Sequence, residues 1–213
     1  MAAPTSAPAE LHRFTLAERL VHGAVAVLVT VLIVSAAVLY LGPLSVLVGH
    51  RYVVATVHAW CGLALPVPVL AGLASVAYRV DLGRLNRFAA ADRRWLRSRV
   101  ARARHEGVGK FNAGQKLNTA LSGGALVVLL GTGVLMYRPS LVALPYRTGA
   151  TFMHDVVAVA LGLLVAGHAY KAVQDREALR GMWTGRVSRG WARTHHPAWE
   201  DSRCTAATPD RWG

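Results

Sequence analysis

The sequence contains few cysteines and few acidic residues for its length. Of its 213 residues only two are cysteine, and 11 are Asp or Glu against 24 Lys or Arg, which gives a formal net charge of +13. Cys61 lies in an apolar run and Cys204 in a polar stretch, so a disulfide is not expected. The sequence also lacks a CxxC or Cys/His pattern. This absence argues against a structural zinc module and against iron–sulfur clusters held by this chain.

Charged residues are also missing from long apolar runs. Residues 20–41, 52–78 and 117–137 contain no Lys, Arg, Asp or Glu, and residues 151–170 contain only Asp155. A bilayer core about 30 Å thick is crossed by roughly 20 helical residues, so each run can span it. We therefore predict an all-α fold, an integral membrane four-helix bundle. No cleavable signal peptide is apparent, because the segment before the first run is polar and that run is too long.

The basic residues are distributed unevenly between the loops. Residues 79–116 contain eleven basic and three acidic residues, whereas the links 42–51 and 138–150 contain one and two arginines. Because Lys and Arg accumulate in cytoplasmic loops, we expect this basic loop and both termini on the cytoplasmic side of a cell inner membrane. The positive charge then faces anionic lipids, and no nucleic-acid partner is needed to explain it.

Three further segments complete the predicted organisation. Residues 1–12 read as a disordered head, residues 13–199 as the membrane domain and residues 200–213 as a tail. Within the basic loop, the stretch LGRLNRFAAADRRWLRSRVARAR mixes cations with apolar side chains. It predicts a helix lying on the inner membrane surface, with a solvated charged helix as the alternative. Pro66 and Pro68 should kink the second span.

Four histidines lie within the apolar spans, namely His22, His58, His154 and His168. Histidine inside a span is uncommon and usually faces the bundle interior, a cofactor or a proton path. His154 and His168 are 14 residues apart, so they share one helix face and are separated by about 21 Å along the axis. Since successive spans run in opposite directions, His22 lies at the depth of His168 and His58 at the depth of His154.

Two histidines at one depth can supply both axial ligands of a low-spin haem. We therefore predict two b haems held between helices, with iron ligated by His22 and His168 at the inner depth and by His58 and His154 at the outer depth. Four structural histidines or a proton relay, in a haem-free membrane anchor or transporter, remain the alternative from another class of protein.

Three other residues near the spans enter the prediction with less weight. His50 lies eight residues before His58 and is a rival ligand, but it falls in a link. Arg19 and Lys171 each lie one turn from a predicted ligand and could contact haem propionates. For each of the two taken separately, an ordinary cation at a membrane boundary is the better explanation.

Several longer motifs occur in order along the chain: RFTLAERLVHG, GKFNAGQKLN, FMHD followed by GHAY, and GMWTGRVSRGWARTHHPAW. Together, from His12 to about Trp199, they resemble the gamma subunit of membrane-bound formate dehydrogenase, a di-haem cytochrome b. The second and fourth motifs are the most discriminating, because a generic di-haem cytochrome has no physical need for them.

The resemblance implies the same two haem pairs and a place in an electron-transfer complex. Electrons would arrive from an iron–sulfur beta subunit, fed by a molybdenum or tungsten alpha subunit, and would reduce menaquinone or ubiquinone near the cytoplasmic surface. Asn112 and Gly114 would line the quinone pocket, with Gln115 and Lys116 as weaker candidates. A hydrogenase or a thiosulfate or polysulfide reductase is the alternative complex. We expect no formate oxidation by this chain alone. The fourth motif contains His195 and His196 but assigns them no role, and its default interpretation is a solvated or subunit-facing tail.

Overall fold

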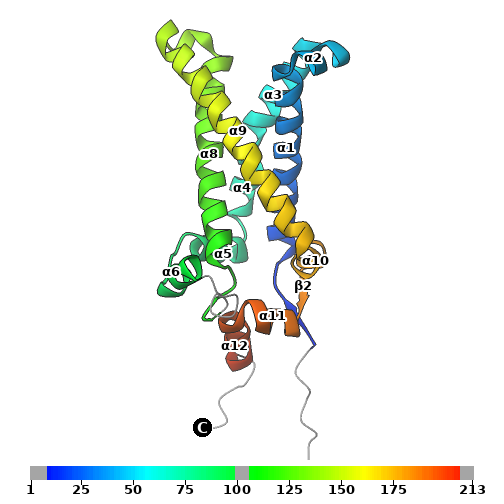
Figure 1. Ribbon diagram of the computed structural model, residues 1–213, viewed down its shortest axis with the longest axis vertical. Coiled ribbons are helices and arrows are strands. Elements are labelled where there is room, and N and C mark those ends of the chain that lie inside the picture. The colour runs from blue at the N-terminus through cyan, green and yellow to red at the C-terminus, as the bar shows by residue number, and fades with distance from the viewer. Residues whose placement is uncertain (1–8, 99–105, 207–213) are drawn as a thin grey trace, which may run out of the picture. The chain divides into compact units, whose positions relative to one another are not determined.

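The computed structural model describes residues 9–98 and 106–206, which are mostly helical (Figure 1). The chain divides into two compact units. Unit 1 combines Met1–Arg19, Val80–Ala120 and Tyr170–Gly213, and unit 2 combines Leu20–Arg79 and Leu121–Ala169. The four predicted histidines all belong to unit 2.

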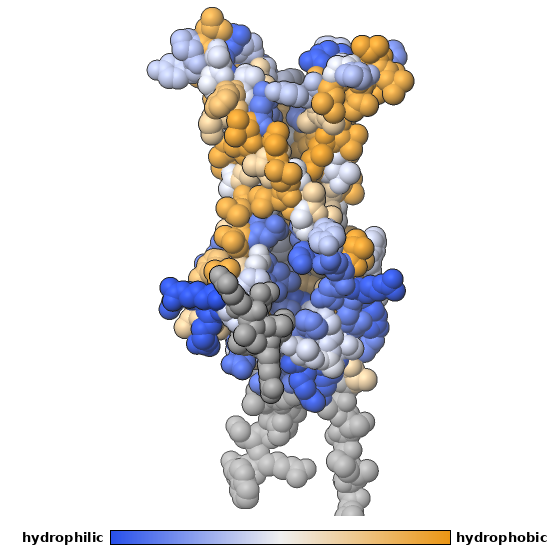
Figure 2. All heavy atoms as spheres, viewed as in Figure 1, coloured by the Kyte–Doolittle hydropathy of each residue, from blue (hydrophilic) through white to orange (hydrophobic). Residues whose placement is uncertain are grey.

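Four long helical segments match the predicted spans. They are α1 (Leu16–Tyr40), α3 (Arg51–Ala64) continued by α4 (Pro66–Gly72), α8 (Ala113–Tyr137) and α9 (Leu144–Gln174). Within the described part of the chain, these four are long and apolar enough to cross a membrane, and at most 11% of the most apolar window of each is buried. Figure 2 shows hydrophobic residues covering the visible face of unit 2. Such exposed apolar helices require lipid around them, which confirms the predicted four-span membrane protein.

The second span is interrupted where its prolines occur. Helix α3 ends at Ala64 and α4 begins at Pro66, whose ring nitrogen has no hydrogen to donate. The helix is thus interrupted at Leu65, directly before the first of the two prolines, and the kink itself stays a prediction. The span ends earlier than predicted, however, because α4 stops at Gly72 and a separate helix, α5 (Val76–Leu85), follows.

The predicted single helix on the membrane surface is wrong. Its sequence forms the end of α5 and a second short helix, α6 (Ala90–Arg97), while residues 99–105 lie outside the described part. The side chain of Asp92 accepts a hydrogen bond from the backbone N–H of Ala89 at 2.7 Å, which starts α6 as a new helix. Lys116 of α8 pairs with Asp92 at 2.7 Å and holds α6 in place.

The links and the C-terminal part contain further short elements. The links hold α2 (Gly42–Val48) and the 3₁₀ helix η1 (Pro139–Leu141), and after α9 come α10 (Arg176–Thr184), α11 (Arg189–His195) and α12 (Pro197–Ala206). Strand β1 (Glu10–His12) pairs antiparallel with β2 (Arg186–Ser188), with Leu11 opposite Val187. The all-α prediction therefore misses a small sheet, and the predicted disordered head is wrong for residues 10–12, while residues 1–8 lie outside the description.

The segment read from sequence as a solvated tail instead forms the hydrophobic core of unit 1. Val187 and Ala192 are fully buried, Trp199 is 6% exposed, and Leu11 and Trp191 pack against them. The predicted tail 200–213 begins inside α12, and residues 207–213 lie outside the described range. The C-terminal segment therefore folds back on the N-terminal strand.

Gly185 joins α10 to β2 at a position that only glycine fits. Its φ is +79°, its carbonyl accepts hydrogen bonds from the N–H groups of Arg13 and Phe14, and an added Cβ would lie 2.5 Å from the carbonyl oxygen of Phe14. We expect Gly185→Ala to lower the free energy of unfolding by about 2 kcal/mol or more, through backbone strain and the clash. Thermal unfolding in detergent measures this loss. Gly190→Ala is the matched control, because its Cβ would meet nothing within 4 Å, and an equal loss in both variants would contradict the account.

Candidate functional site

The four histidines of the spans meet as two pairs inside unit 2. The ring centroids of His22 (α1) and His168 (α9) are 6.2 Å apart, and those of His58 (α3) and His154 (α9) are 6.3 Å apart. These are the two pairs predicted from helical spacing. His50 precedes α3 in the left-handed conformation, with φ +43°, and its side chain is exposed in the link.

Both rings of the His58–His154 pair have a hydroxyl partner. The Oγ of Ser35 (α1) lies 2.8 Å from Nδ1 of His58, and the Oγ1 of Thr132 (α8) lies 2.9 Å from Nδ1 of His154. Gly133 follows Thr132, and a Cβ there would lie 3.4 Å from Cε1 of His154. The missing side chain lets α8 pass close to this imidazole. Sequence analysis missed Ser35 and Thr132, since a hydroxyl in a span usually bonds only to its own helix.

The separation of the paired rings fits two ligands on opposite sides of one metal ion. Two metal–imidazole bonds of about 2.0 Å, as at zinc, would place the coordinating nitrogens about 4 Å apart and the ring centroids about 6 Å apart. Open space also occurs along α9 between its two histidines, because a Cβ at Gly162 would meet nothing within 4 Å.

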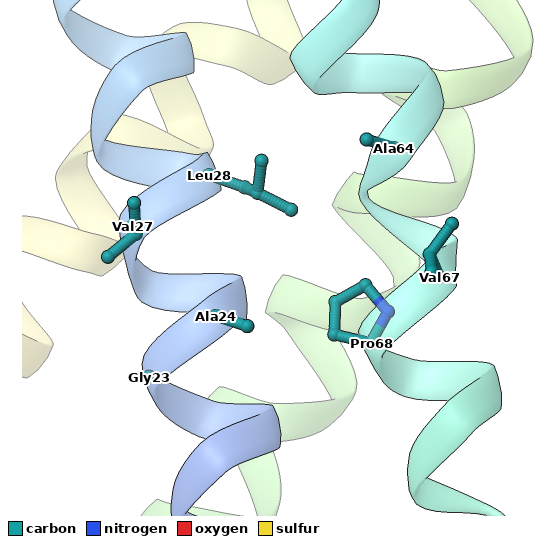
Figure 3. A pocket seen from close by; sticks show the side chains of 7 residues that line it. All are labelled: Gly23, Ala24, Val27, Leu28, Ala64, Val67 and Pro68. Carbon is teal, nitrogen blue, oxygen red and sulfur yellow. The ribbon is translucent and has the colours of Figure 1, made fainter.

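An apolar groove of about 570 Å³ separates α1 from the α3–α4 segment (Figure 3). Its walls are small or aliphatic side chains, namely Gly23, Ala24, Val27, Leu28, Ala64, Val67 and Pro68. The lining offers no acid, base or nucleophile. The groove therefore provides room beside the helices but no chemistry of its own.

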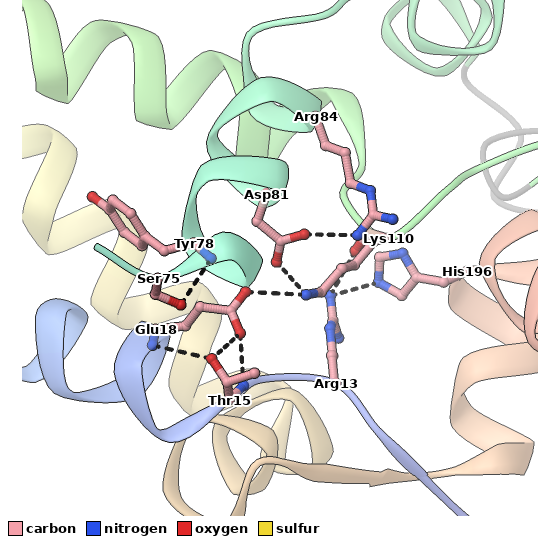
Figure 4. A network of polar contacts seen from close by, with 9 residues as sticks. All are labelled: Arg13, Thr15, Glu18, Ser75, Tyr78, Asp81, Arg84, Lys110 and His196. Carbon is pink, nitrogen blue, oxygen red and sulfur yellow. Dashed lines mark hydrogen bonds and ion pairs between the residues drawn. The ribbon is translucent and has the colours of Figure 1, made fainter. Parts of the chain in front are cut away.

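Unit 1 contains a buried cluster of charges around Lys110. The Nζ of Lys110 lies 3.3 Å from Glu18 and also pairs with Asp81, and Asp81 accepts a hydrogen bond from Arg84 at 2.8 Å (Figure 4). Glu18 further accepts hydrogen bonds from the N–H and hydroxyl of Thr15, which cap α1. Burial and the neighbouring Glu18 carboxyl raise the pKa of Asp81 to about 6, against the lowering effect of Lys110 and Arg84.

A second buried contact involves Arg13 and His196, whose side chains lie side by side in Figure 4. The guanidinium of Arg13 donates to the Lys110 carbonyl at 3.0 Å, lies 3.2 Å from Nε2 of His196 and stacks 4.6 Å from the Trp191 ring centroid. Burial lowers the pKa of Arg13 to about 10, so it stays charged at neutral pH. His196 must then accept at Nε2 and donate from Nδ1 to the Gly109 carbonyl at 2.7 Å, which fixes its tautomer. The role of His196, absent from the sequence prediction, is to tie α12 to the GKFNAGQK segment.

The residues predicted to line a quinone pocket lie at the start of α8. The side chain of Asn112 accepts from the N–H of Gln115, and that of Gln115 accepts from the N–H of Asn112, each at 2.9 Å. This reciprocal capping box explains both residues structurally. A Cβ at Gly114 would lie 2.9 Å from Cη2 of Trp95, so this glycine admits the indole of α6. The weaker candidates Gln115 and Lys116 are accounted for by the cap and by the ion pair with Asp92.

The two cations predicted at haem propionates have different surroundings. Arg19 donates to the carbonyls of Met182, at 3.0 Å, and Trp183, so its guanidinium satisfies the last turn of α10. A guanidinium has five N–H donors, so these two bonds do not test the propionate contact of Arg19, which stays a prediction. Lys171 is exposed and lies 3.2 Å from the side chain of Gln174. For Lys171 the propionate contact stays a prediction.

Four exposed apolar helices that carry two facing pairs of histidines define the class, a multi-span membrane protein with imidazole donors between its helices. The family model of the prokaryotic cytochrome b561 matches residues 13–185, which is most of the chain. The chain belongs to the prokaryotic cytochrome b561 family. Haem b is the cofactor that this family implies, and the two histidine pairs have the donor chemistry that it needs.

Several relatives are subunits of formate dehydrogenases. The chain is 36% identical over 95 residues to the cytochrome b556(Fdn) subunit of the nitrate-inducible formate dehydrogenase of Escherichia coli, which covers 43% of this chain and 44% of the relative. It is 34% identical over 94 residues to the cytochrome b556(fdo) subunit of Escherichia coli, with the same coverage, and to a formate dehydrogenase cytochrome b556 subunit of Haemophilus influenzae, covering 43% and 40%. The matched segment spans less than half the length of these relatives.

Proposed function

We propose that the chain is the membrane-anchoring cytochrome b subunit of a formate dehydrogenase complex, and that it carries electrons through two b haems to a quinone. The single observation that carries this proposal is the pair of ring separations, 6.2 Å for His22–His168 and 6.3 Å for His58–His154. A haem-free anchor or transporter has no need for two opposed pairs at this distance.

The chain's own residues would ligate the two haem irons, fix their positions and keep water away from the electron route. When bound, b haem supplies reversible one-electron transfer. His22 and His168 would hold one iron and His58 and His154 the other, and a haem held by two histidines would supply electron transfer rather than binding of oxygen or substrate. The apolar helices keep water away from the route, which runs about 21 Å along α9 between His154 and His168.

The direction of transfer follows from the proposed orientation. With the basic loop and both termini in the cytoplasm, the His58–His154 pair lies near the outer surface and the His22–His168 pair near the inner surface. An iron–sulfur subunit, fed by a molybdenum or tungsten subunit that oxidises formate, would deliver electrons at the outer pair. The names of the relatives support formate dehydrogenase as the complex. Turnover would then separate charge across the membrane without a proton channel.

Affinity purification of the full complex from its native membrane tests the choice of partner. The expected co-purifying subunits are an iron–sulfur protein and a molybdenum or tungsten formate dehydrogenase, and the complex should reduce menaquinone or ubiquinone with formate. In proteoliposomes this turnover should build a membrane potential. Recovery with a hydrogenase or a thiosulfate or polysulfide reductase would replace the proposed partner, and electroneutral turnover would refute the charge separation.

At the quinone end, we propose that the Asn112 amide donates a hydrogen bond to a quinone carbonyl. The Oδ1 of Asn112 already caps α8, so Nδ2 is the atom offered to a ligand. Asn112→Asp keeps the capping oxygen and removes the amide donor. We expect quinone to reoxidise the reduced haems up to about tenfold more slowly in this variant, since one hydrogen bond contributes about 0.5–1.5 kcal/mol.

Stopped-flow absorbance at the haem bands measures this rate with a menaquinone analogue. Asn118→Ala is the control, because Asn118 lies on the same helix outside the cap. An unchanged rate in Asn112→Asp, with normal haem content, would remove Asn112 from the quinone site.

A further inference from the structure

We propose that Ser35 and Thr132 are positioning residues that lower the reduction potential of the iron held by His58 and His154 relative to the iron held by His22 and His168. The inference deepens the proposed function and rests on it. Its basis is a difference between the two histidine pairs: one pair is hydrogen-bonded to hydroxyls at both rings, and the other is not.

The direction of the hydroxyl contacts can be assigned from their other partners. Ser35 Oγ donates to the carbonyl of Val31 at 2.6 Å, and Thr132 Oγ1 donates to the carbonyl of Val128 at 2.8 Å. A hydroxyl has only one hydrogen to donate, so each oxygen faces its histidine with a lone pair. His58 and His154 therefore carry their protons at Nδ1 and donate them to the hydroxyls. Nε2 of each ring is left with the lone pair that binds a metal.

The same contacts fix the two rings. Ser35 is 6% exposed and lies on α1, whereas its partner His58 lies on α3. Thr132 lies on α8, and its partner His154 lies on α9. The backbone of α8 comes close to His154 at Gly133. Each hydroxyl thus joins two different spans. Outer partners of this kind fix the tautomer and orientation of a ligating imidazole and raise its basicity.

The second pair lacks this arrangement. Among the residues that the structure describes, no hydrogen bond joins a hydroxyl or a carbonyl to a ring nitrogen of His22 or His168. A more basic imidazole stabilises ferric iron more than ferrous iron, so the hydroxyl-bonded pair should have the lower potential. Transfer of one electron from the centre at His58–His154, with the lower potential, to the centre at His22–His168, with the higher potential, would then be thermodynamically favourable. The two hydroxyls would give the path its inward direction.

A potentiometric titration followed by the haem absorbance tests the inference. The His168→Ala background isolates the His58–His154 centre as a single wave, and Ser35→Ala and Thr132→Val are introduced into it separately. We expect a positive shift of the midpoint potential in each, because each removes one hydrogen bond to a ligand. Ser35→Thr and Thr132→Ser, which keep a hydroxyl, should restore the original potential.

Two controls separate this effect from a general disturbance of the fold. Thr30→Val removes a hydroxyl of α1 that bonds only to its own helix, at Ala26, and should leave the potential unchanged. Ser35→Ala in the His58→Ala background, where only the His22–His168 centre remains, should also cause no shift. Unchanged potentials in Ser35→Ala and Thr132→Val with haem retained would overturn this inference alone. Absence of haem from the wild type would overturn the proposed function together with it.

Discussion

The variant His168→Ala is expected to hold one b haem per chain, against the two that we propose for the wild type. In the wild type the ring of His168 lies 6.2 Å from that of His22, so the substitution would remove one of the two histidines that would hold this haem. The His58–His154 pair, 6.3 Å apart, is untouched and should keep its haem. Pyridine haemochrome analysis of the purified variant measures the content, and His154→Ala should likewise leave one haem.

The matched control for these variants is His50→Asn. His50 is the histidine nearest in sequence to the second span, but it is exposed in the link and adopts the left-handed conformation that asparagine also tolerates. We expect it to retain two haems and the wild-type spectrum. A variant of His50 that loses a haem, or a variant of His168 that keeps both, would show that the pairs are wrongly assigned.

The variant Lys110→Met is expected to lose about 3–5 kcal/mol of folding stability, because removing one partner of a buried ion pair leaves uncompensated charge. Lys110 is 8% exposed and lies between Glu18 and Asp81, whose side chains are each 7% exposed. Thermal or denaturant unfolding in detergent measures the loss. Arg193→Met removes a cation whose side chain is 70% exposed and should cost little.

The loss of folding stability in Lys110→Met should become smaller as the pH falls. In the wild type, burial already raises the pKa of Asp81 from its ordinary value of 3.8 to about 6. Between these two pH values the native state therefore keeps a proton on Asp81 that the unfolded chain has released. The contribution of Asp81 to stability therefore declines as the pH rises from about 4 to 6. Without Lys110 the pKa of Asp81 rises further, and protonation at low pH relieves the uncompensated charge. An equal loss at pH 5 and pH 8 would contradict the assignment of a buried charge cluster.

The membrane part of the fold could be predicted because its physics is local. The positions of the spans follow from apolar runs, the interruption before Pro66 follows from its missing N–H, and the pairing of His22 with His168 follows from helical spacing and alternating direction. The hydroxyl partners were not predicted, since Ser35 and His58 are 23 residues apart and belong to different spans. Their contact depends on helix rotation, which side-chain packing determines.

Unit 1 was largely missed because its contacts join the ends of the chain. Arg13 and His196 are 183 residues apart, and β1 finds its partner strand near residue 187. No periodicity within either segment indicates such a pairing, and a solvated or subunit-facing tail is the default interpretation of the C-terminal segment. One signal was available: Asn112 followed three residues later by Gln115 is the pattern of a capping box at a helix start.

The most direct test of the account is the ratio of haem to protein in the detergent-purified wild-type chain. A dithionite-reduced minus oxidised spectrum identifies the haem type, and pyridine haemochrome quantification gives the number per chain. The account predicts b haem at two per chain, one for each histidine pair. A folded, purified chain that contains no haem would contradict it and would favour a membrane anchor or transporter whose histidines are structural.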